Sequence, residues 1–136
     1  LHVSTTGTDA DWVVKVIDEK TLAFPGPTPN PAYVAMGGYQ QLVRGEPFRA
    51  KFRRSLEKPE PLTPGKVETI EFAMPDIAHT FRPGHKIMVQ IQSSWFPLVD
   101  RNPQKFMDIS KAVDADFVKA THKVHRGSSV TLSVVP

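Results

Sequence analysis

The residues best suited to catalysis in this 136-residue chain are its serines and its five histidines. A serine nucleophile of the α/β-hydrolase type stands in a G-x-S-x-G turn, and a positioned histidine activates it. Ser128 and Ser129 follow Gly127, but no glycine follows them at the required spacing. Ser93-Ser94 stand at the expected end of a strand, where hydroxyl groups more often bond to the backbone. The sequence therefore indicates no catalytic residue.

The spacing of the histidines also argues against a metal site. His122 and His125 are three residues apart, which on a strand sends their side chains to opposite faces. His79 and His85 flank the turn at 81–84, which could bring them close, but no carboxylate lies beside them in the sequence. We interpret these histidines as structural.

Two pairs of aspartates are the remaining candidates for cation ligands. Asp9 and Asp11 lie in the segment 8–11, and Asp114 and Asp116 form a second pair. Ca²⁺ takes six to eight oxygen ligands, more than either pair supplies, so we expect capping of backbone groups instead. Cysteine is absent, which excludes cysteine-ligated metals and disulfides. The sequence predicts no metal and no other cofactor.

The net charge of +3 comes from 17 basic and 14 acidic residues. One dense basic run alternates with apolar residues, and we expect it to form the solvated outer face of a strand over 48–54. Its members are Arg49, Lys51, Arg53 and Arg54. The alternative is contact with an acidic partner surface or with sugar-bound anions. The other basic residues are dispersed and lack interleaved aromatic residues, which argues against a nucleic-acid partner. No signal peptide and no apolar run of roughly 18 residues is visible, so no membrane partner is predicted.

An apolar loop is the strongest candidate for a functional contact. Four consecutive apolar residues are followed by polar ones, and a loop with this much apolar surface usually buries it against something. We predict an interdomain or substrate-access contact there, and the alternative is that the loop folds back over its own sheet edge. The predicted contact residues are Trp95, Phe96, Pro97, Leu98, Asp100 and Arg101.

The elements that position these residues are predicted to be short strands. Alternation of apolar and polar residues favours strands over 2–6, 12–18, 48–54, 67–74, 85–93, 120–124 and 130–134. Trp12 and Phe48 should face the core, as should Ile87, Val89 and Ile91. Only 110–120 has helical spacing. The 13 prolines gather partly in loops over 24–31 and 59–64. This pattern predicts one all-β domain over 1–136, an antiparallel β-sandwich.

Four blocks of the sequence resemble one known family, in the family's order. They are STTGTDADWVVK (4–15), RGEPFR (44–49), FRPGHKI (81–87) and, most specifically, QSSWFPLVDRNPQ (92–104). The chain resembles the C-terminal β-sandwich domain of the X-prolyl dipeptidyl-peptidase, cocaine esterase and α-amino-acid ester hydrolase family. Glutaryl acylase-like proteins belong to the same group.

The resemblance implies a jelly roll of the galactose-binding-like class, here expected to lack its first strands. It implies a parent serine hydrolase that acts on Xaa-Pro peptides, esters or acyl-amides, with its catalytic triad in an upstream α/β-hydrolase domain. That hydrolase domain of the same polypeptide is the implied partner. The chain itself would be non-catalytic, would pack on the hydrolase domain and would shape substrate access.

Two alternatives follow from the fold class and from the expected missing strands. Galactose-binding-like folds include carbohydrate-binding modules, but such modules usually present coplanar exposed aromatics, and here only Trp95 and Phe96 are adjacent. Glycan-array binding would favour that alternative. A missing strand would leave an exposed strand edge, through which a homo-oligomer could form.

Overall fold

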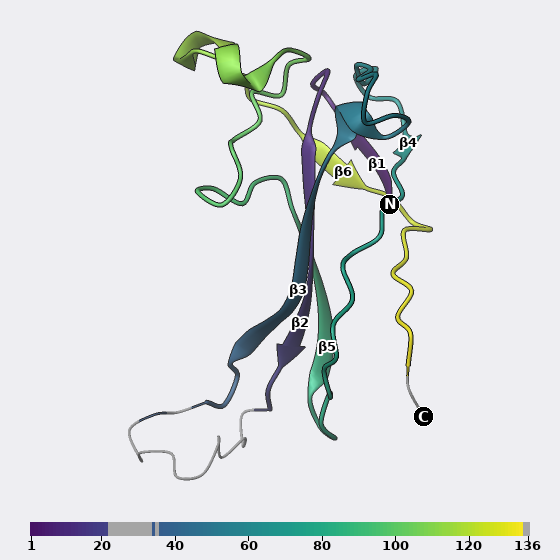
Figure 1. Ribbon diagram of the computed structural model, residues 1–136, viewed down its shortest axis with the longest axis vertical. Coiled ribbons are helices and arrows are strands. Elements are labelled where there is room, and N and C mark those ends of the chain that lie inside the picture. Colours follow the sequence, from purple (N-terminus) through teal and green to yellow (C-terminus); the bar gives the residue numbers. More distant parts are fainter. Residues whose placement is uncertain (22–33, 35, 135–136) are drawn as a thin grey trace. The chain divides into compact units, whose positions relative to one another are not determined.

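The computed structural model describes residues 1–21, 34 and 36–134, and the regular structure in them is almost entirely strand (Figure 1). Three one-turn 3₁₀ helices accompany the strands. No helix in the described residues is long and apolar enough to cross a membrane. In chain order the elements are β1 (His2–Thr5), β2 (Asp11–Glu19), β3 (Gln40–Arg49), η1 (Ala50–Phe52), β4 (Glu68–Thr69), β5 (Lys86–Gln92), η2 (Ile109–Lys111), η3 (Asp114–Asp116) and β6 (His122–Val124).

The chain divides into two compact units, and the first contains a three-stranded sheet. This unit comprises Leu1–Trp12, Phe48–Ala73 and Ser93–Pro136. Its sheet has the order β4-β1-β6 with antiparallel pairing, and Val3 on the central strand lies opposite both Glu68 and Val124. Val3 is buried because its strand has a neighbour on each side.

The second unit, Val13–Pro47 with Met74–Gln92, contains a sheet of order β3-β2-β5 (Figure 1). Strands β2 and β5 pair antiparallel over their full common length, from Val13 opposite Gln92 to Glu19 opposite Lys86. The β2 sequence is rich in valine and isoleucine, residues that favour a pleated and buried strand. Its side chains are buried on both faces, as expected for the central strand of a sheet.

The predicted all-β class with antiparallel sheets is confirmed. The predicted strands at 2–6, 12–18, 85–93 and 120–124 correspond to β1, β2, β5 and β6. Trp12 is 2% exposed, so its predicted core position is also confirmed. The predicted loop at 24–31 lies outside the described residues.

Two predicted apolar core positions are wrong. Ile87 and Val89 on β5 are 53% and 42% exposed. In the antiparallel register they share a face with Asp18 and Val16 of β2. The described residues therefore leave this face of β5 largely uncovered.

The predicted helix over 110–120 is also wrong. Two separate turns, η2 and η3, stand in its place. Asp108 accepts a hydrogen bond from the Ser110 backbone N–H, and Asp116 accepts one from the Val113 backbone N–H. These local bonds compete with a continuous helix, which is the general effect of aspartate near a chain turn.

Three other predicted strands are shorter than expected or absent. The strand at 48–54 ends at Arg49, because the Ala50 N–H donates to the Ala10 carbonyl and the Lys51 N–H to the Asp9 carboxylate. Over 67–74 only the two residues of β4 are strand. No strand forms over 130–134.

Candidate functional site

Two segments that the sequence analysis singled out, the aspartate segment 8–11 and the apolar loop, meet in the first unit. The Asn102 side-chain amide donates to Asp11 Oδ1 at 2.8 Å. The Thr8 N–H donates to the Gln104 carbonyl at 3.0 Å, and the Phe106 N–H donates to Thr8 Oγ1 at 2.8 Å. These bonds fasten the end of the apolar loop, residues 93–104, to the segment that leads into β2.

The base of this loop is shaped by its own side chains. Asn102 Oδ1 accepts from the Gln104 backbone N–H at 2.8 Å, and Gln104 has the left-handed φ of 66°. The Gln104 side chain donates back to the Asn102 carbonyl at 3.0 Å. A side chain at Gly7 would collide with the Gln104 carbonyl oxygen, so the close approach of these two segments requires glycine there.

Beneath the loop, Asp11 is a fully paired carboxylate. It is 5% exposed and accepts both Nε and Nη2 of Arg49, at 3.0 and 3.2 Å, besides the amide of Asn102. A bidentate guanidinium with a further donor compensates a buried negative charge well. Asp11 therefore joins β2, the end of β3 and the loop.

Asp9 is more deeply buried and less completely paired. Its Oδ1 accepts the backbone N–H groups of Ala10 and Lys51, so the predicted capping role is confirmed for this residue. Lys51 Nζ lies 4.0 Å from Asp9 Oδ2 and donates to the Met107 carbonyl at 2.7 Å. Burial raises the pKa of Asp9, against the opposing effect of hydrogen bonds from Ala10 and Asn102.

The predicted solvated face of the basic run is wrong. Arg49 binds Asp11, Lys51 is 8% exposed, and the side chain of Arg53 is 4% exposed. Arg53 Nε lies 3.5 Å from Glu68 Oε2, and its other nitrogens donate to the carbonyls of Ala50, Glu60 and Pro61. These three cations are buried or half-buried because they pair with acidic residues from other segments. Of the four basic residues, Arg54 alone has a mostly exposed side chain, at 59%.

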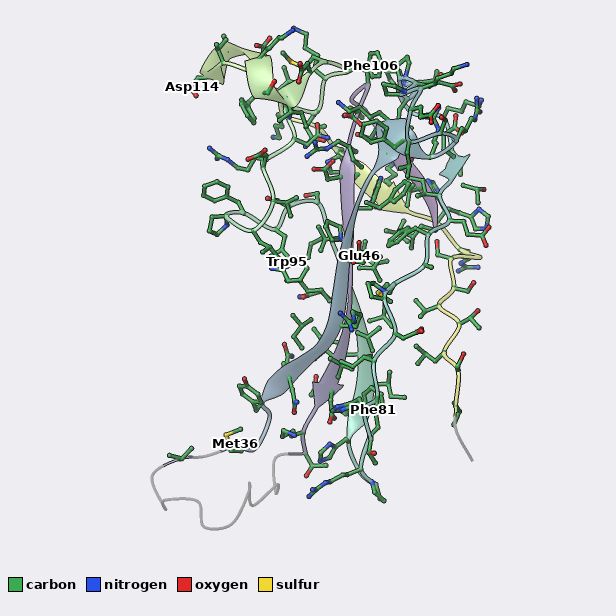
Figure 2. All side chains as sticks on the ribbon, in the orientation of Figure 1. Met36, Glu46, Phe81, Trp95, Phe106 and Asp114 are labelled. Atoms are coloured by element: carbon green, nitrogen blue, oxygen red, sulfur yellow. The ribbon has the colours of Figure 1, made fainter. Side chains whose placement is uncertain are left out.

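The tip of the loop presents apolar surface to solvent. Figure 2 labels Trp95 at the start of this segment. Trp95 is partly buried, whereas Phe96 and Leu98 are 62% and 70% exposed, and Pro97 is exposed between them. The polar residues Asp100 and Arg101 are exposed as well.

Arg101 lies between two phenyl rings. Its guanidinium carbon is 5.4 Å from the ring centroid of Phe96 and 5.7 Å from that of Phe117, both within cation–π range. The backbone of the loop is bonded by Asn102, which accepts the Gln104 N–H. Sequence reasoning missed both Asn102 and Phe117. The polar residue types that bond backbone in turns were the available signal for Asn102.

In the second unit, His79 and His85 converge as the intervening turn suggested. His79 Nε2 is 3.0 Å from Asp18 Oδ2, and His85 Nδ1 is 2.8 Å from Asp18 Oδ1. Burial alone would raise the pKa of Asp18, but the hydrogen bonds from the two histidines bring it below its ordinary value. The carboxylate that was absent from the neighbouring sequence thus comes from the end of β2.

A serine–histidine pair in the first unit lacks the other requirements of catalysis. Ser4 Oγ is 2.9 Å from His125 Nε2, but Ser4 is only 9% exposed. Among the described residues, no carboxylate bonds His125 and no three acidic or histidine side chains could share a metal ion. The hollow beside the pair has no interior room for a water-sized molecule, so it does not have the volume of a small-ligand site. Its lining residues are Val3, Ser4, Thr5, Trp12, Leu62 and Lys66.

Comparison with known proteins gives one family for nearly the whole chain. The model of the X-Pro dipeptidyl-peptidase C-terminal non-catalytic domain matches residues 1–135. Cocaine esterase from Rhodococcus sp. (strain MB1 Bresler) is 30% identical over 127 residues, which are 93% of this chain and 20% of the esterase.

Two solved structures are similar in both sequence and fold. An aminopeptidase from a marine sediment archaeon, Thaumarchaeota archaeon, is 47% identical with a TM-score of 0.83, and the match covers 93% of this chain and 20% of that one. A selenomethionine-labelled α-amino acid ester hydrolase is 45% identical with a TM-score of 0.80, covering 90% of this chain and 19% of that one. The chain thus spans about a fifth of the length of these relatives.

Proposed function

Because the chain belongs to the family of non-catalytic C-terminal domains of X-Pro dipeptidyl-peptidases, we propose that it packs on the catalytic domain of a larger hydrolase. The contact is made by the apolar loop, through Trp95, Phe96, Pro97, Leu98, Asp100 and Arg101. By covering the edge of that domain, the loop helps to shape the route by which substrate enters.

The observation that carries this proposal is an exposed apolar tip on a fixed base. Asn102, Gln104 and Gly7 hold the base of the loop by the close contacts described above. Phe96 and Leu98 nevertheless remain mostly exposed, which is unfavourable in water at about 25 cal/mol per Å² of apolar surface. A fixed loop loses little conformational entropy when a partner covers it, so the arrangement favours docking.

The parent activity follows from the relatives' chemistry. The similar proteins are an esterase, an aminopeptidase and an α-amino acid ester hydrolase. All three names denote hydrolysis at a carbonyl group. They support the parent that the sequence resemblance implies, a serine hydrolase acting on Xaa-Pro peptides, esters or acyl-amides. The nucleophile, base and acid of this reaction belong to the catalytic domain, which this chain supports.

The proposal is tested by Phe96→Ala in the full-length protein. The variant should reduce kcat/KM or lower the temperature at which the catalytic domain unfolds, because the docking contact is weakened. Leu56→Ala is the matched control, since Leu56 is 79% exposed in the same unit but lies outside the loop. If both variants leave kinetics and unfolding at wild-type values, the loop is not a docking contact.

A further inference from the structure

Arg101 is a cation without a counter-charge among the described residues. Its contacts there are the rings of Phe96 and Phe117, and it takes part in no hydrogen bond or ion pair. The neighbouring Asp100 is exposed and forms no ion pair with it. By contrast, Arg49 and Arg53 in the same unit have carboxylate partners.

The second ring, Phe117, is held beside the loop by its own segment. The Val118 N–H donates to the Pro103 carbonyl at 3.1 Å, and Lys105 Nζ lies 2.9 Å from Asp116 Oδ1. These bonds connect both flanks of Phe117 to the end of the apolar loop. Phe117 is therefore held where it contacts Arg101 of the loop.

The surroundings of the charge are apolar and open to solvent. The two rings that contact the guanidinium, Phe96 and Phe117, are 62% and 40% exposed. A partner that covers these groups removes water from the guanidinium as well. Desolvating an unpaired charge is costly, so a partner that fits must bring an anion to this point.

We propose that Arg101 forms a salt bridge with a carboxylate of the part of the same polypeptide that lies outside residues 1–136. This inference rests on the proposed docking function and names its charged centre. The guanidinium contacts both rings, and a planar guanidinium pairs with a carboxylate through two parallel hydrogen bonds. The relatives are about five times as long as the matched segment, so the same polypeptide is the partner of first choice.

A zero-length carbodiimide cross-link identifies the partner directly. The full-length protein carrying Arg101→Lys is treated with the reagent, digested and analysed by mass spectrometry. The expected product is an amide bond between position 101 and an aspartate or glutamate outside residues 1–136. Wild type is the matched control, because an arginine side chain does not form this bond, and Lys105 with Asp116 provides an internal positive control.

Mixing isotopically light and heavy protein distinguishes the sources of the carboxylate. A cross-link within one molecule to a residue outside 1–136 supports the proposal. A mixed-isotope product would assign the surface to a second copy of the chain and overturn it. Absence of any product at position 101, while the Lys105–Asp116 product forms, overturns it too.

A charge reversal provides an independent readout. In the full-length protein, Arg101→Glu should increase hydrogen exchange of the loop amides about tenfold or more at low salt, and Arg101→Gln by less. Equal effects of the two variants would contradict a role for charge. If Phe96→Ala weakens docking while both Arg101 variants behave as wild type, the proposed function stands and this inference fails.

Discussion

Asp11 joins three parts of the chain through a single carboxylate. It starts β2, binds Arg49 at the end of β3 and accepts the amide of Asn102 from the loop. Removing one donor from a buried acceptor destabilises the fold, because the acceptor stays out of water without that hydrogen bond. Asn102 is therefore the residue whose removal should loosen the loop without deleting its exposed surface.

Asn102→Ala in the full-length protein should reduce the free energy of unfolding by about 1–3 kcal/mol, because Asp11 and the Gln104 N–H both lose a partner. Denaturant unfolding measures the change. Glu57→Ala is the control, and as an exposed residue outside the loop it should stay within about 0.5 kcal/mol of wild type. Equal effects of the two variants would mean that the Asn102 bonds do not hold the loop.

The lowered pKa of Asp18 should make the stability of the second unit depend on pH. Its pKa is lowered in the folded protein by His79 and His85, against the opposing effect of burial. A carboxylate with a depressed pKa stabilises the fold above its unfolded pKa of about 4, and this stabilisation is lost as the pH falls through the folded pKa.

Asp18→Asn should therefore destabilise the protein at pH 7 by about 1–3 kcal/mol and flatten the loss of stability below about pH 4. Thermal unfolding of both proteins across pH 2–7 measures this. An exposed carboxylate, Glu57, is the control, and Glu57→Gln should leave the profile unchanged. A variant profile for Asp18→Asn parallel to wild type would show that the histidines do not stabilise the charged form.

At the scale of elements, the strands with a clear apolar pattern could be predicted from the sequence, but their partners could not. The valine–isoleucine run of β2 and the alternation of β5 predict both strands, whereas the structure supplies their pairing with each other. Alternation does not reveal whether a face is covered, and Ile87 and Val89 were assigned to the core for that reason.

Polar contacts between distant segments also could not be predicted from the sequence. Arg49, Lys51 and Arg53 alternate like a solvated face, yet each meets a carboxylate or carbonyl from another segment. The same holds for Asp18, which lies 61 residues from His79. Of the candidate site, the exposed tip was predicted, whereas the bonds of its base were not, because they depend on how distant segments meet.

The contact between the loop base and the segment before β2 predicts a strict requirement at Gly7. Gly7→Ala places a methyl group against the Gln104 carbonyl, and backbone must move to accommodate it. Such overpacking typically costs about 1–3 kcal/mol, which denaturant unfolding of the full-length protein should detect. Gly65→Ala is the contrast, since a side chain there meets no atom within 4 Å and only the left-handed φ of 77° opposes it.

At the scale of the whole molecule, we propose that the chain supports a larger hydrolase and that its exposed loop faces the rest of that polypeptide. It belongs to a family of non-catalytic C-terminal domains, and its relatives are about five times as long as the matched segment. The exposed apolar tip and Arg101, which has no carboxylate partner in the described part of the chain, lie on the same loop. Docking of this loop on another domain would both cover the apolar tip and give Arg101 a counter-charge.

An experimental structure of the full-length protein tests this account most directly, through the exposure of a single side chain. Phe96 is 62% exposed in this chain by itself. We predict that its ring is buried against the catalytic domain, with a carboxylate of that domain within hydrogen-bond distance of the Arg101 guanidinium. A structure in which Phe96 and Leu98 remain open to solvent, and no other domain touches residues 95–101, would contradict the account.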